Sequence, residues 1–487
     1  MDSSLRNSLN PNKLLKEEFV SNLTGSSMIE IAALSTIIPI LVILRHSFYS
    51  SGVIDHTAAD ASLKKSDNPV IHSKSLKRYL AAITVDFLVI VIPTILFFTV
   101  SNVLAEWSCL CAYIKCCMSC CWANKSLLHH ADKKPLYSQH RIHSHSPTWE
   151  TANQSLKENI SSFRVVVMIT TCLCILAVDF RIFPRRYAKT ETYGTSLMDL
   201  GVGSFVLANS LVSQQARNVP STKRKGALKS VFPLIVLGLV RLITTSGVDY
   251  QVHVGEYGVH WNFFFTLAGV SILTTVINIP PQYSGIIGTT ILVGYQCWLT
   301  YGLNTYLLSN QRGSDIISQN KEGIFSIFGY WSIYLIGVQL GNSIFFGKNS
   351  TATLRSNRRA RIIVWILALS FWMATLLLDS HVEKVSRRTC NLAYVNLVLA
   401  QNLQVLAILM LSSYVTGNGT SVLEEAFNSN LLAAFLLANL LTGLVNLSVD
   451  TLSTSSIFAL FILLAYAFTL STLTGLAKFY GMRLKFW

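Results

Sequence analysis

The chain has 487 residues, of which 51% are hydrophobic and only 13% are charged, about half the charged share of an average soluble protein. Its mean hydropathy is +0.45. This composition excludes an intrinsically disordered chain and argues against a soluble enzyme of two or three domains. Because apolar stretches of about 20 residues, the length that crosses a bilayer, recur along the sequence, we expect a polytopic membrane protein.

The N-terminal segment 1–27 carries charges but no apolar core or cleavage site, which predicts that no signal peptide is removed. Thirteen candidate transmembrane helices follow it, and they predict an all-α fold that forms a single membrane-embedded domain over residues 1–487. The spans are expected at 28–49, 79–99, 100–119, 161–179, 195–214, 230–246, 260–279, 284–301, 326–346, 361–379, 391–413, 430–448 and 457–477.

The basic residues of the loops predict the orientation of these spans. An odd number of spans places the termini on opposite sides, and a cytosolic C-terminus puts 24 Lys and Arg residues on the cytosolic side against 12 on the other. We therefore expect a luminal segment 1–27 and a cytosolic C-terminus. The net charge of +15 is then mostly cytosolic and faces anionic membrane lipids. Nucleic acid is not an expected partner, because no recognition module accompanies the charge.

A cysteine- and histidine-rich stretch lies in and after the third predicted span. Zinc binding is one interpretation, since thiolates and imidazoles are zinc ligands. The other is a cysteine cluster at the membrane edge, open to S-acylation, that leads into a solvated cytosolic loop over 119–160. We predict no metal site, because paired C-x2-C motifs are absent from the sequence. The residues are Cys109, Cys111, Cys116, Cys117, Cys120 and Cys121, followed by His129, His130, His140, His143 and His145.

Nine of the twelve luminal cations lie in three short loops, at 180–194, 302–325 and 380–390. Lys and Arg are normally scarce in luminal loops. Basic residues are tolerated there where they bind an anion. In the first loop, Asp179 closes an apolar helix, and a partly dehydrated carboxylate is a candidate general base for a hydroxyl group. The alternative is an ion-pair network that only closes the end of the helix.

The cations that follow Asp179 suggest binding of anionic substrate groups. Arg185 and Arg186 are candidate phosphate ligands, because a guanidinium binds phosphate through two parallel hydrogen bonds. Lys189 is a candidate for stabilising the oxyanion of an acyl-transfer step. Pro184 ends any helix between Asp179 and Lys189, so we expect the chain to turn and both side chains to face one pocket.

A second polar loop separates two apolar spans and is a candidate wall for a catalytic or head-group site. Structural hydrogen bonding and a His/Glu metal pair are the alternatives, although no H-x-x-x-H or H-E-x-x-H spacing occurs. The candidate residues are Asp249, His253, Glu256, His260 and Asn262, with Lys321, Arg387, Arg388 and Asn446 from other luminal segments. Gly201 and Gly203 lie in an apolar run, so we expect them to permit close helix packing.

Several of these blocks resemble one known family. Residues 179–203 (DFRIFPRRYAKTETYGTSLMDLGVG) and 250–264 resemble signature blocks of the inositol acyltransferases of glycosylphosphatidylinositol (GPI) anchor biosynthesis, in a plant-like form. Segments within 16–25, 320–324, 385–388 and 439–450 support the resemblance, which is weak through 50–160.

The resemblance implies a multi-pass enzyme of the endoplasmic reticulum with thirteen spans. Such a membrane-bound O-acyltransferase moves a fatty acyl chain, typically palmitoyl, from acyl-CoA to the inositol 2-hydroxyl of glucosaminyl-phosphatidylinositol. It implies acyl-CoA as co-substrate, no cofactor, and a luminal site. By motif, the essential acid and cation are Asp179 and Lys189.

Two other classes of function stay open from the sequence. A lipid or small-molecule transporter could use the intramembrane Asp199 and Arg241, but no inverted repeat accompanies them. A luminal-facing glycosyltransferase would be expected to carry paired acidic residues in its first luminal loop, where only Glu106 occurs. A covalent acyl-enzyme is disfavoured, because no luminal Ser or Cys has a base at motif spacing. We therefore expect direct acyl transfer.

Overall fold

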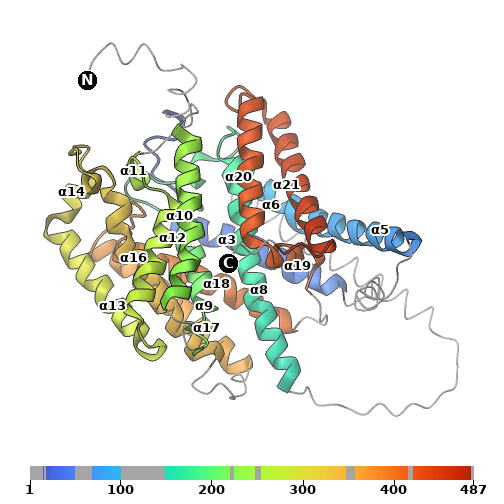
Figure 1. The fold of residues 1–487 in the computed structure, drawn as a ribbon, viewed down its shortest axis with the longest axis horizontal. Coiled ribbons are helices and arrows are strands. Elements are labelled where there is room, and N and C mark those ends of the chain that lie inside the picture. Colours follow the sequence, from blue (N-terminus) through green and yellow to red (C-terminus); the bar gives the residue numbers. More distant parts are fainter. Residues whose placement is uncertain are drawn as a thin grey trace. The chain divides into compact units, whose positions relative to one another are not determined.

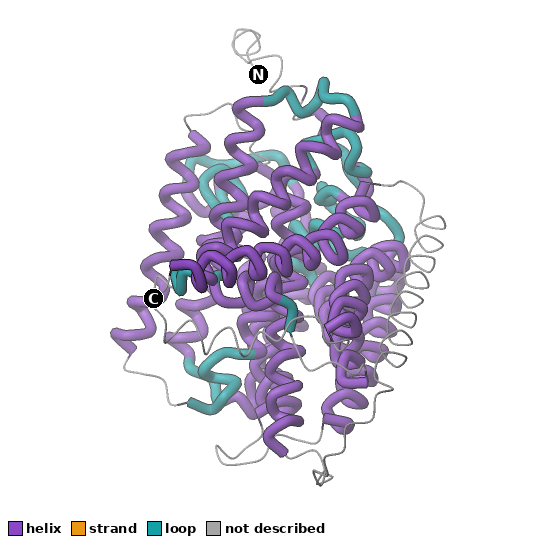
Figure 2. The backbone as a smooth tube through the Cα atoms, turned by 90° about the vertical axis from the view of Figure 1, so that its right-hand side faces the viewer, coloured by secondary structure: helices purple, strands orange, loops and turns teal. Residues whose placement is uncertain are grey.

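The computed structural model describes Leu15 and residues 18–49, 69–99, 149–219, 224–246, 254–346, 357–414 and 420–483. In this part of the chain the secondary structure is helical and contains no β-strand (Figures 1 and 2). The only extended pairing there is an isolated bridge at Thr195 with Gly25 and Ser26. The all-α prediction is confirmed for the described residues.

The long helices follow the apolar blocks of the sequence, with short helical turns at several of their ends. They are α3 (Met28–Tyr49), α5 (Pro69–Asp86), η1 (Phe87–Val91), α6 (Ile92–Thr99), α8 (Trp149–Ala177), η2 (Arg185–Tyr187), α9 (Leu200–Leu211), α10 (Arg224–Ser246), α11 (Val254–Tyr257), α12 (Phe263–Ile277), α13 (Pro281–Trp298), η3 (Leu299–Leu303), α14 (Asn304–Leu308), α15 (Ile316–Gln319), α16 (Lys321–Leu340), η4 (Gly341–Phe346), α17 (Asn357–His381), α18 (Leu392–Leu409), η5 (Met410–Tyr414), α19 (Val422–Ser429), α20 (Leu431–Ser448) and α21 (Ser456–Phe479).

Eight helical segments of the described chain are long and apolar enough to cross a membrane. They are Met28–His46, Ser75–Thr99, Leu156–Ala177, Lys321–Phe346, Arg358–His381, Leu392–Ser412, Leu431–Ser448 and Ser456–Phe479, and three shorter apolar helices accompany them. Twelve of the thirteen expected spans coincide with a helix, whereas the expected span 100–119 lies outside the described residues. A polytopic membrane protein is confirmed, and the number of spans stays a prediction.

Two expected boundaries were wrong. The span expected at 195–214 is helical only over Leu200–Leu211, because the backbone N–H and hydroxyl of Thr190 donate to the Asp199 carboxylate and hold it in the preceding loop. Asp199 therefore precedes α9 instead of lying one turn inside it. The loop expected at 119–160 ends earlier than predicted, because α8 already begins at Trp149. The cysteine- and histidine-rich part of that loop lies outside the described residues.

The chain divides into two compact units, each of which is described by itself. Unit 1 comprises residues 1–32, 185–404 and 486–487, and unit 2 comprises residues 33–184 and 405–485. One division between the units falls between Pro184 and Arg185, in the loop 180–194. The expectation of a single domain over 1–487 stays a prediction.

Small residues bring the helices of unit 1 close together around α16. A Cβ added to Gly337 would lie 1.9 Å from Ser210 Oγ of α9, and one added to Gly203 would lie 2.8 Å from two methyl carbons of Val398 on α18. Helices approach this closely only where a side chain is missing. The packing role expected for Gly203 is confirmed. That for Gly201 is wrong, because nothing lies within 4 Å of a Cβ added there.

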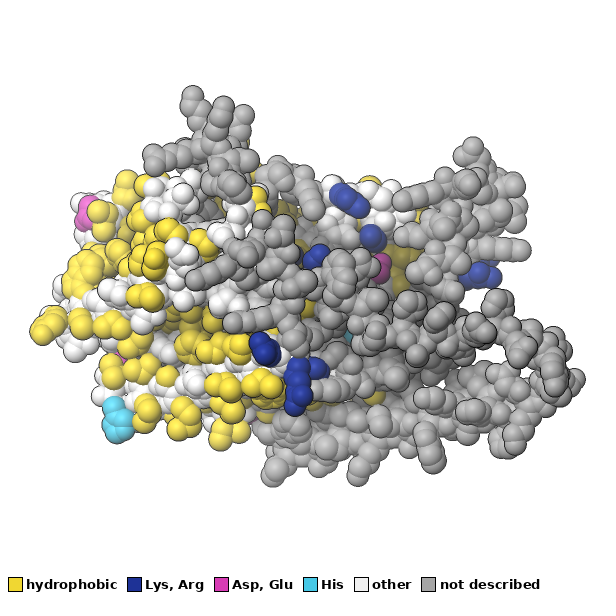
Figure 3. All heavy atoms as spheres, turned by 90° about the horizontal axis from the view of Figure 1, so that it is seen from below, with side chains coloured by type: hydrophobic (Ala, Val, Ile, Leu, Met, Phe, Trp, Pro, Cys, Tyr) yellow, Lys and Arg dark blue, Asp and Glu magenta, His cyan; other side chains and the backbone are white. Residues whose placement is uncertain are grey.

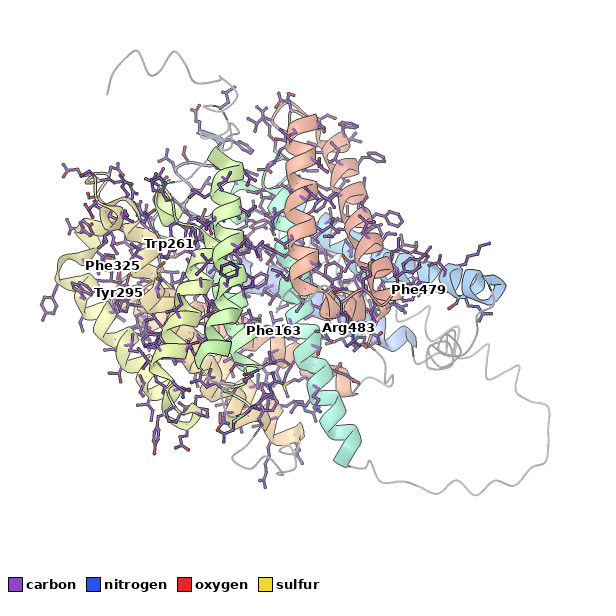
Figure 4. All side chains as sticks on the ribbon, in the orientation of Figure 1. Phe163, Trp261, Tyr295, Phe325, Phe479 and Arg483 are labelled. Atoms are coloured by element: carbon purple, nitrogen blue, oxygen red, sulfur yellow. The ribbon has the colours of Figure 1, made fainter. Side chains whose placement is uncertain are left out.

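Aromatic side chains fill the contact between α13 and α16. The ring of Tyr295 stacks on Phe328 with centroids 5.6 Å apart, and Trp298 meets Phe325 edge-on at 5.4 Å. Tyr295 and Phe325 are labelled in Figure 4. Such pairs stabilise packing by about 0.5–1.5 kcal/mol beyond the apolar area that they bury.

The outer helices present apolar side chains to their surroundings. Ile286 of α13 is 64% exposed, and Leu369 and Met373 of α17 are 61% and 59% exposed. Figure 3 shows hydrophobic side chains gathered over much of the described part of one face. Exposed apolar surface on this scale fits a lipid environment.

Contacts in unit 1 sort its loops into two groups. Side-chain contacts join residues 189–199, 254–260, 307–322 and 383–391. A separate set joins residues 213–219 to the α12–α13 connection and to η4: Gln215 donates to the Ile279 carbonyl, and Asn342 Nδ2 donates to the Ala216 carbonyl at 2.9 Å. These are the groups that the loop charges assign to opposite sides. Which group faces the lumen stays a prediction.

We expect the first group of loops to be luminal and the second to be cytosolic. Single cysteines introduced as Ser314→Cys and Gln214→Cys, both exposed, test this in a background without other accessible cysteines. In sealed microsomes, an impermeant maleimide should label only the residue 214 cysteine, and detergent should expose both. Labelling of only the residue 314 cysteine in intact vesicles would reverse the orientation.

Unit 2 has a buried polar centre. Arg45 Nε of α3 lies 2.5 Å from Asp86 Oδ1 of α5, and His46 Nε2 lies 2.7 Å from Glu424 Oε2 of α19. Glu424 also completes a capping box with Ser421 at the start of α19. These pairs join α3 to α5 and to α19. Each buried charge has a partner, which offsets the cost of removing it from water.

Candidate functional site

The segment that follows Pro184 begins with the single turn η2 and stays irregular up to Asp199. Gly194 has a φ of +124°, and a Cβ added there would lie 2.0 Å from the Thr24 carbonyl oxygen, so only glycine fits. The backbone N–H of Ser26 donates to the Thr195 carbonyl at 2.7 Å. These contacts fix the segment 185–199 against the N-terminal residues of unit 1.

Lys189 begins a chain of ion pairs that leads into the protein. Its Nζ lies 2.7 Å from Glu256 Oε1 of α11, and the same oxygen lies 3.1 Å from Arg387 Nη1. Arg387 Nε lies 2.9 Å from Asp199 Oδ1, and that carboxylate also accepts the Thr190 hydroxyl at 2.8 Å. The Lys189 side chain is 42% exposed, whereas those of Arg387 and Asp199 are 5% and 1% exposed. Lys189 is thus the accessible end of a buried network.

The charge state of Glu256 follows from its position in this network. Burial raises the pKa of Glu256, but the charges of Lys189 and Arg387 outweigh burial and lower the pKa to about 2. The carboxylate therefore stays ionised at neutral pH and holds the Lys189 ammonium by charge. Its contribution to stability is present above the unfolded-state pKa of about 4.3. That contribution is lost as the pH falls toward 2.

A second ion-pair cluster lies beside α11. Glu322, at the start of α16, accepts hydrogen bonds from Arg388 Nη2 at 3.0 Å and from Arg312 at 2.7 and 3.0 Å. A Cβ added to Gly255 would lie 3.4 Å from Arg388 Nη1. The consecutive residues Arg387 and Arg388 therefore bind different carboxylates, and together they fix α11 in place.

Three of the predicted substrate ligands are bound to protein groups in this structure. Arg387 and Arg388 are buried and paired with carboxylates, as described above. The Lys321 ammonium donates to the carbonyls of Tyr306, Ser309 and Gln311 at 2.6–3.1 Å and is fully buried. These contacts stabilise the loops, and substrate binding by the three residues stays a prediction.

The polar loop before α12 is only partly described. Asp249 and His253 lie outside the described residues. The backbone N–H of His260 donates to Asn320 Oδ1 at 2.8 Å, and the residue is exposed. Asn262 caps α12 by accepting the N–H groups of Phe264 and Phe265. The predicted contacts of these four residues with substrate stay untested.

Arg185 and Arg186 contact the N-terminal segment of unit 1. The Arg185 guanidinium lies 3.9 Å from the centre of the Phe19 ring. Arg186 Nε donates to Glu30 Oε1 at 2.8 Å, and the Tyr187 hydroxyl donates to the same oxygen at 2.7 Å. The Arg186 side chain is 33% exposed, which leaves part of the guanidinium accessible. Phosphate binding by the pair stays a prediction.

Asp179 belongs to unit 2, where it follows the end of α8 at Ala177. The Asn446 side chain of α20 donates to Asp179 Oδ2 at 2.8 Å. Two residues predicted for the site from distant parts of the sequence are therefore in direct contact. Because Lys189 belongs to unit 1, the expected pairing of Asp179 with Lys189 stays a prediction.

An apolar pocket lies beside the end of α8 in unit 2. Ala177 and Leu173 of α8 contribute to it, and the other lining residues come from α6 and α21: Ile95, Phe98, Thr99, Leu463 and Tyr466. The Tyr466 hydroxyl donates to the Cys172 carbonyl at 2.7 Å, so its ring presents an apolar face to the pocket. The pocket is small, and most of the side chains that line it are apolar.

The sequence interpretation identified Glu256 but missed two other carboxylates that hold the cations in place. Asp199 was considered only for a transporter, and Glu322 was not among the predicted site residues. The signal for both was present, because a carboxylate at the end of an apolar span is costly unless it has a partner. Asp199 binds Arg387, 188 residues away in sequence, and Glu322 binds Arg388, 66 residues away, besides Arg312, ten residues away. No local pattern reveals the two distant partners.

Comparison with known families matches residues 12–477 to the family GWT1. The chain belongs to the GWT1 family. It is 52% identical over 450 residues to an uncharacterized protein of Arabidopsis thaliana, covering 92% of this chain and 98% of the relative. The family expected from the motifs is thereby confirmed.

Other GWT1 relatives carry names that refer to GPI biosynthesis. The chain is 37% identical to the phosphatidylinositol-glycan biosynthesis class W protein of Dictyostelium discoideum, over 69% of this chain and 76% of that protein. It is 36% identical to GPI-anchored wall transfer protein 1 of Aspergillus oryzae, over 96% and 97% of the two chains. The family match itself reaches from the N-terminal segment to the last described helix.

Replacing Arg387 should destabilise this GWT1 protein strongly. Arg387→Leu leaves Asp199 and Glu256 without their shared counter-charge, and loss of one partner from a buried ion pair costs about 3–5 kcal/mol. Thermal unfolding of the full chain in detergent should show a clearly lower midpoint. Arg181→Leu, at an exposed arginine, is the matched control. Equal midpoints for the two variants would show that the network does not stabilise the fold.

Proposed function

We propose that this protein transfers a fatty acyl chain, palmitoyl in the first instance, from acyl-CoA to the inositol 2-hydroxyl of glucosaminyl-phosphatidylinositol. Membership of the GWT1 family and the names of its relatives support an enzyme of GPI biosynthesis. The observation that carries the proposal is the half-exposed Lys189, which an ionised Glu256 holds within the motif that resembles inositol acyltransferases.

Asp179 is the proposed general base. Its carboxylate accepts the proton of the inositol 2-hydroxyl while the oxygen attacks the thioester carbonyl carbon. The Asn446 amide donates to one oxygen of this carboxylate and so helps to orient it. The acyl chain is proposed to lie between helices.

Lys189 is the proposed electrostatic partner of the transition state. The tetrahedral intermediate carries its negative charge on the former carbonyl oxygen, and an ammonium held in a fixed position stabilises that charge. A lysine ammonium has three donors, and Glu256 accepts one of them, so donors remain for the oxyanion. The intermediate then loses the coenzyme A thiolate, which takes up the proton from Asp179. No acyl-enzyme is needed.

The remaining predicted residues are proposed to bind the substrates. Arg185 and Arg186 would neutralise substrate phosphates. The loop that contains Asp249, His253, His260 and Asn262 would orient the sugar groups. We propose that both units belong to one catalytic domain over 1–487 and that the enzyme is a multi-pass protein of the endoplasmic reticulum. Acyl-CoA is the proposed co-substrate, and no cofactor is proposed.

Purified full-length protein in liposomes tests the proposal. With palmitoyl-CoA and glucosaminyl-phosphatidylinositol, we expect a product heavier by one palmitoyl group, together with free coenzyme A, by mass spectrometry. Transport of the lipid without a change in mass would favour a transporter. Sugar transfer from a polyprenyl-phosphate donor, without acyl transfer, would favour a glycosyltransferase.

A further inference from the structure

Glu383 differs from Asp199, Glu256 and Glu322 in the charge of the groups that bind it. Its Oε1 accepts the Asn304 amide at 2.7 Å and the Tyr193 hydroxyl at 3.2 Å, and its Oε2 accepts the Gln296 amide at 2.6 Å. All three donors are neutral. Among the described residues no Lys, Arg or His forms an ion pair with Glu383, whereas Asp199, Glu256 and Glu322 each bind an arginine.

The surroundings of Glu383 favour a cation. A half-buried carboxylate is stabilised only in part by neutral donors, because hydrogen bonds to it do not cancel its charge. Three donors also leave part of its acceptor capacity unused, since an ionised carboxylate has about four acceptor positions. Asn304 Oδ1 is buried and accepts no hydrogen bond from the described residues. Two acceptors are thus available for an N–H donor that carries positive charge.

Other contacts hold this group of residues rigidly. Gln296 Oε1 accepts the Leu392 N–H at 2.9 Å, which turns the Gln296 amide N–H toward Glu383. The neighbouring Tyr295, labelled in Figure 4, donates its hydroxyl to the Thr389 carbonyl at 2.8 Å. The loop that carries Glu383 is therefore fixed to α13, and the carboxylate is held in one position.

Glu383 lies close to the Lys189 network along the chain. Tyr193 follows Lys189 by four residues, and Glu383 precedes Arg387 by four. The two segments run beside each other, because Ser386 Oγ donates to the Thr192 carbonyl at 2.6 Å and the Gly194 N–H donates to the Val385 carbonyl at 2.9 Å. Four residues span at most about 14 Å, which is comparable with the length of two linked sugar rings.

We propose that Glu383 and the Asn304 carbonyl bind the primary ammonium of the amino sugar in the acceptor lipid. A primary ammonium has three N–H donors and the charge that Glu383 lacks. The inference rests on the proposed function. It adds a reason why the enzyme would select an acceptor lipid with a free amine. An N-acetylated sugar carries no charge and adds bulk at the same atom, so the site selects the free amine.

A cycle of two enzymes and two acceptors tests this binding site. The enzymes are wild type and Glu383→Gln, and the acceptors are glucosaminyl-phosphatidylinositol and an analogue in which a hydroxyl replaces the amine. Loss of a charge-assisted contact should lower kcat/KM about 10- to 100-fold. For the wild-type enzyme, we expect kcat/KM on the hydroxyl analogue to be lower by this factor than on the amine acceptor. For Glu383→Gln, we expect kcat/KM on the amine acceptor to be lower by the same factor than that of wild type. The two enzymes should then act alike on the analogue.

Controls separate binding from structure. Glu425→Gln, at an exposed glutamate of α19, should retain the wild-type preference for the amine. If Glu383→Gln does not fold, Glu383→Asp keeps the charge on a shorter side chain and should show a reduced but measurable preference.

Three outcomes would overturn the site. They are an equal loss on both acceptors for Glu383→Gln, no loss at all for that variant, and an unchanged preference for Glu383→Asp. Failure of the wild-type enzyme to acylate the amine acceptor would instead overturn the proposed function.

Discussion

Asp179→Asn is expected to lower kcat by about 10²–10⁴-fold, the contribution of a positioned general base. Asparagine keeps the size of the side chain, and its carbonyl oxygen can still accept the Asn446 amide that Asp179 accepts at 2.8 Å. The variant therefore removes proton acceptance with little change in packing. Steady-state kinetics of the purified enzyme, with palmitoyl-CoA binding measured separately, should show a loss in kcat with nearly unchanged binding.

Asp450→Asn is the matched control for this variant. Asp450 is exposed and follows α20, the helix that carries Asn446. It should keep most of the wild-type rate. If Asp179→Asn kept more than about half of wild-type turnover, Asp179 would not be the base, and His260 or His253 would be the next residue to replace.

Lys189→Ala is expected to cost a comparable factor in kcat, about 10²–10³-fold for loss of one donor to an oxyanion. The structure adds a second expectation. Arg387 remains paired with Glu256 when Lys189 is removed, so the fold should keep its thermal midpoint. Lys189→Arg should recover little activity, because a planar guanidinium does not replace a compact ammonium. Measurements of kcat and of the midpoint on the same preparations separate catalysis from folding.

The double variant gives a sharper result than either single one. If Asp179 and Lys189 act on one transition state, their losses should be far from multiplicative. Lys77→Ala, at an exposed lysine of α5, is the control for removal of a positive charge. Losses that multiply fully in the double variant would show that the two residues act in separate steps.

The helices were predictable because apolar length is a local property of the sequence. The expected span 284–301 corresponds to α13, which begins at Pro281 because proline suits the first turn of a helix. The late start of α9 was not predictable. It depends on Thr190 donating to Asp199 across nine residues of irregular chain, and hydropathy does not report such a contact.

The candidate site was predicted as a set of residues but not as a set of pairs. Lys189, Glu256 and Arg387 were all identified, yet the arginine was expected to bind substrate, and the structure pairs it with Glu256 and Asp199. A sequence shows that a basic residue lies in a loop expected to be luminal, where basic residues are normally scarce. It does not show whether the counter-charge comes from the protein or from a ligand. Glu383 was missed for a related reason, because its neutral donors come from three separate segments.

The most direct test of the account uses an acceptor that lacks only the proposed nucleophile. Purified wild-type enzyme is given palmitoyl-CoA and either glucosaminyl-phosphatidylinositol or its 2-deoxy-inositol analogue, and the acylated lipid is measured by mass spectrometry. We predict that the natural acceptor gains one palmitoyl group and that the analogue gains none, although it still competes with the natural acceptor. Acylation of the 2-deoxy analogue, or of neither lipid, would contradict acyl transfer to the inositol 2-hydroxyl.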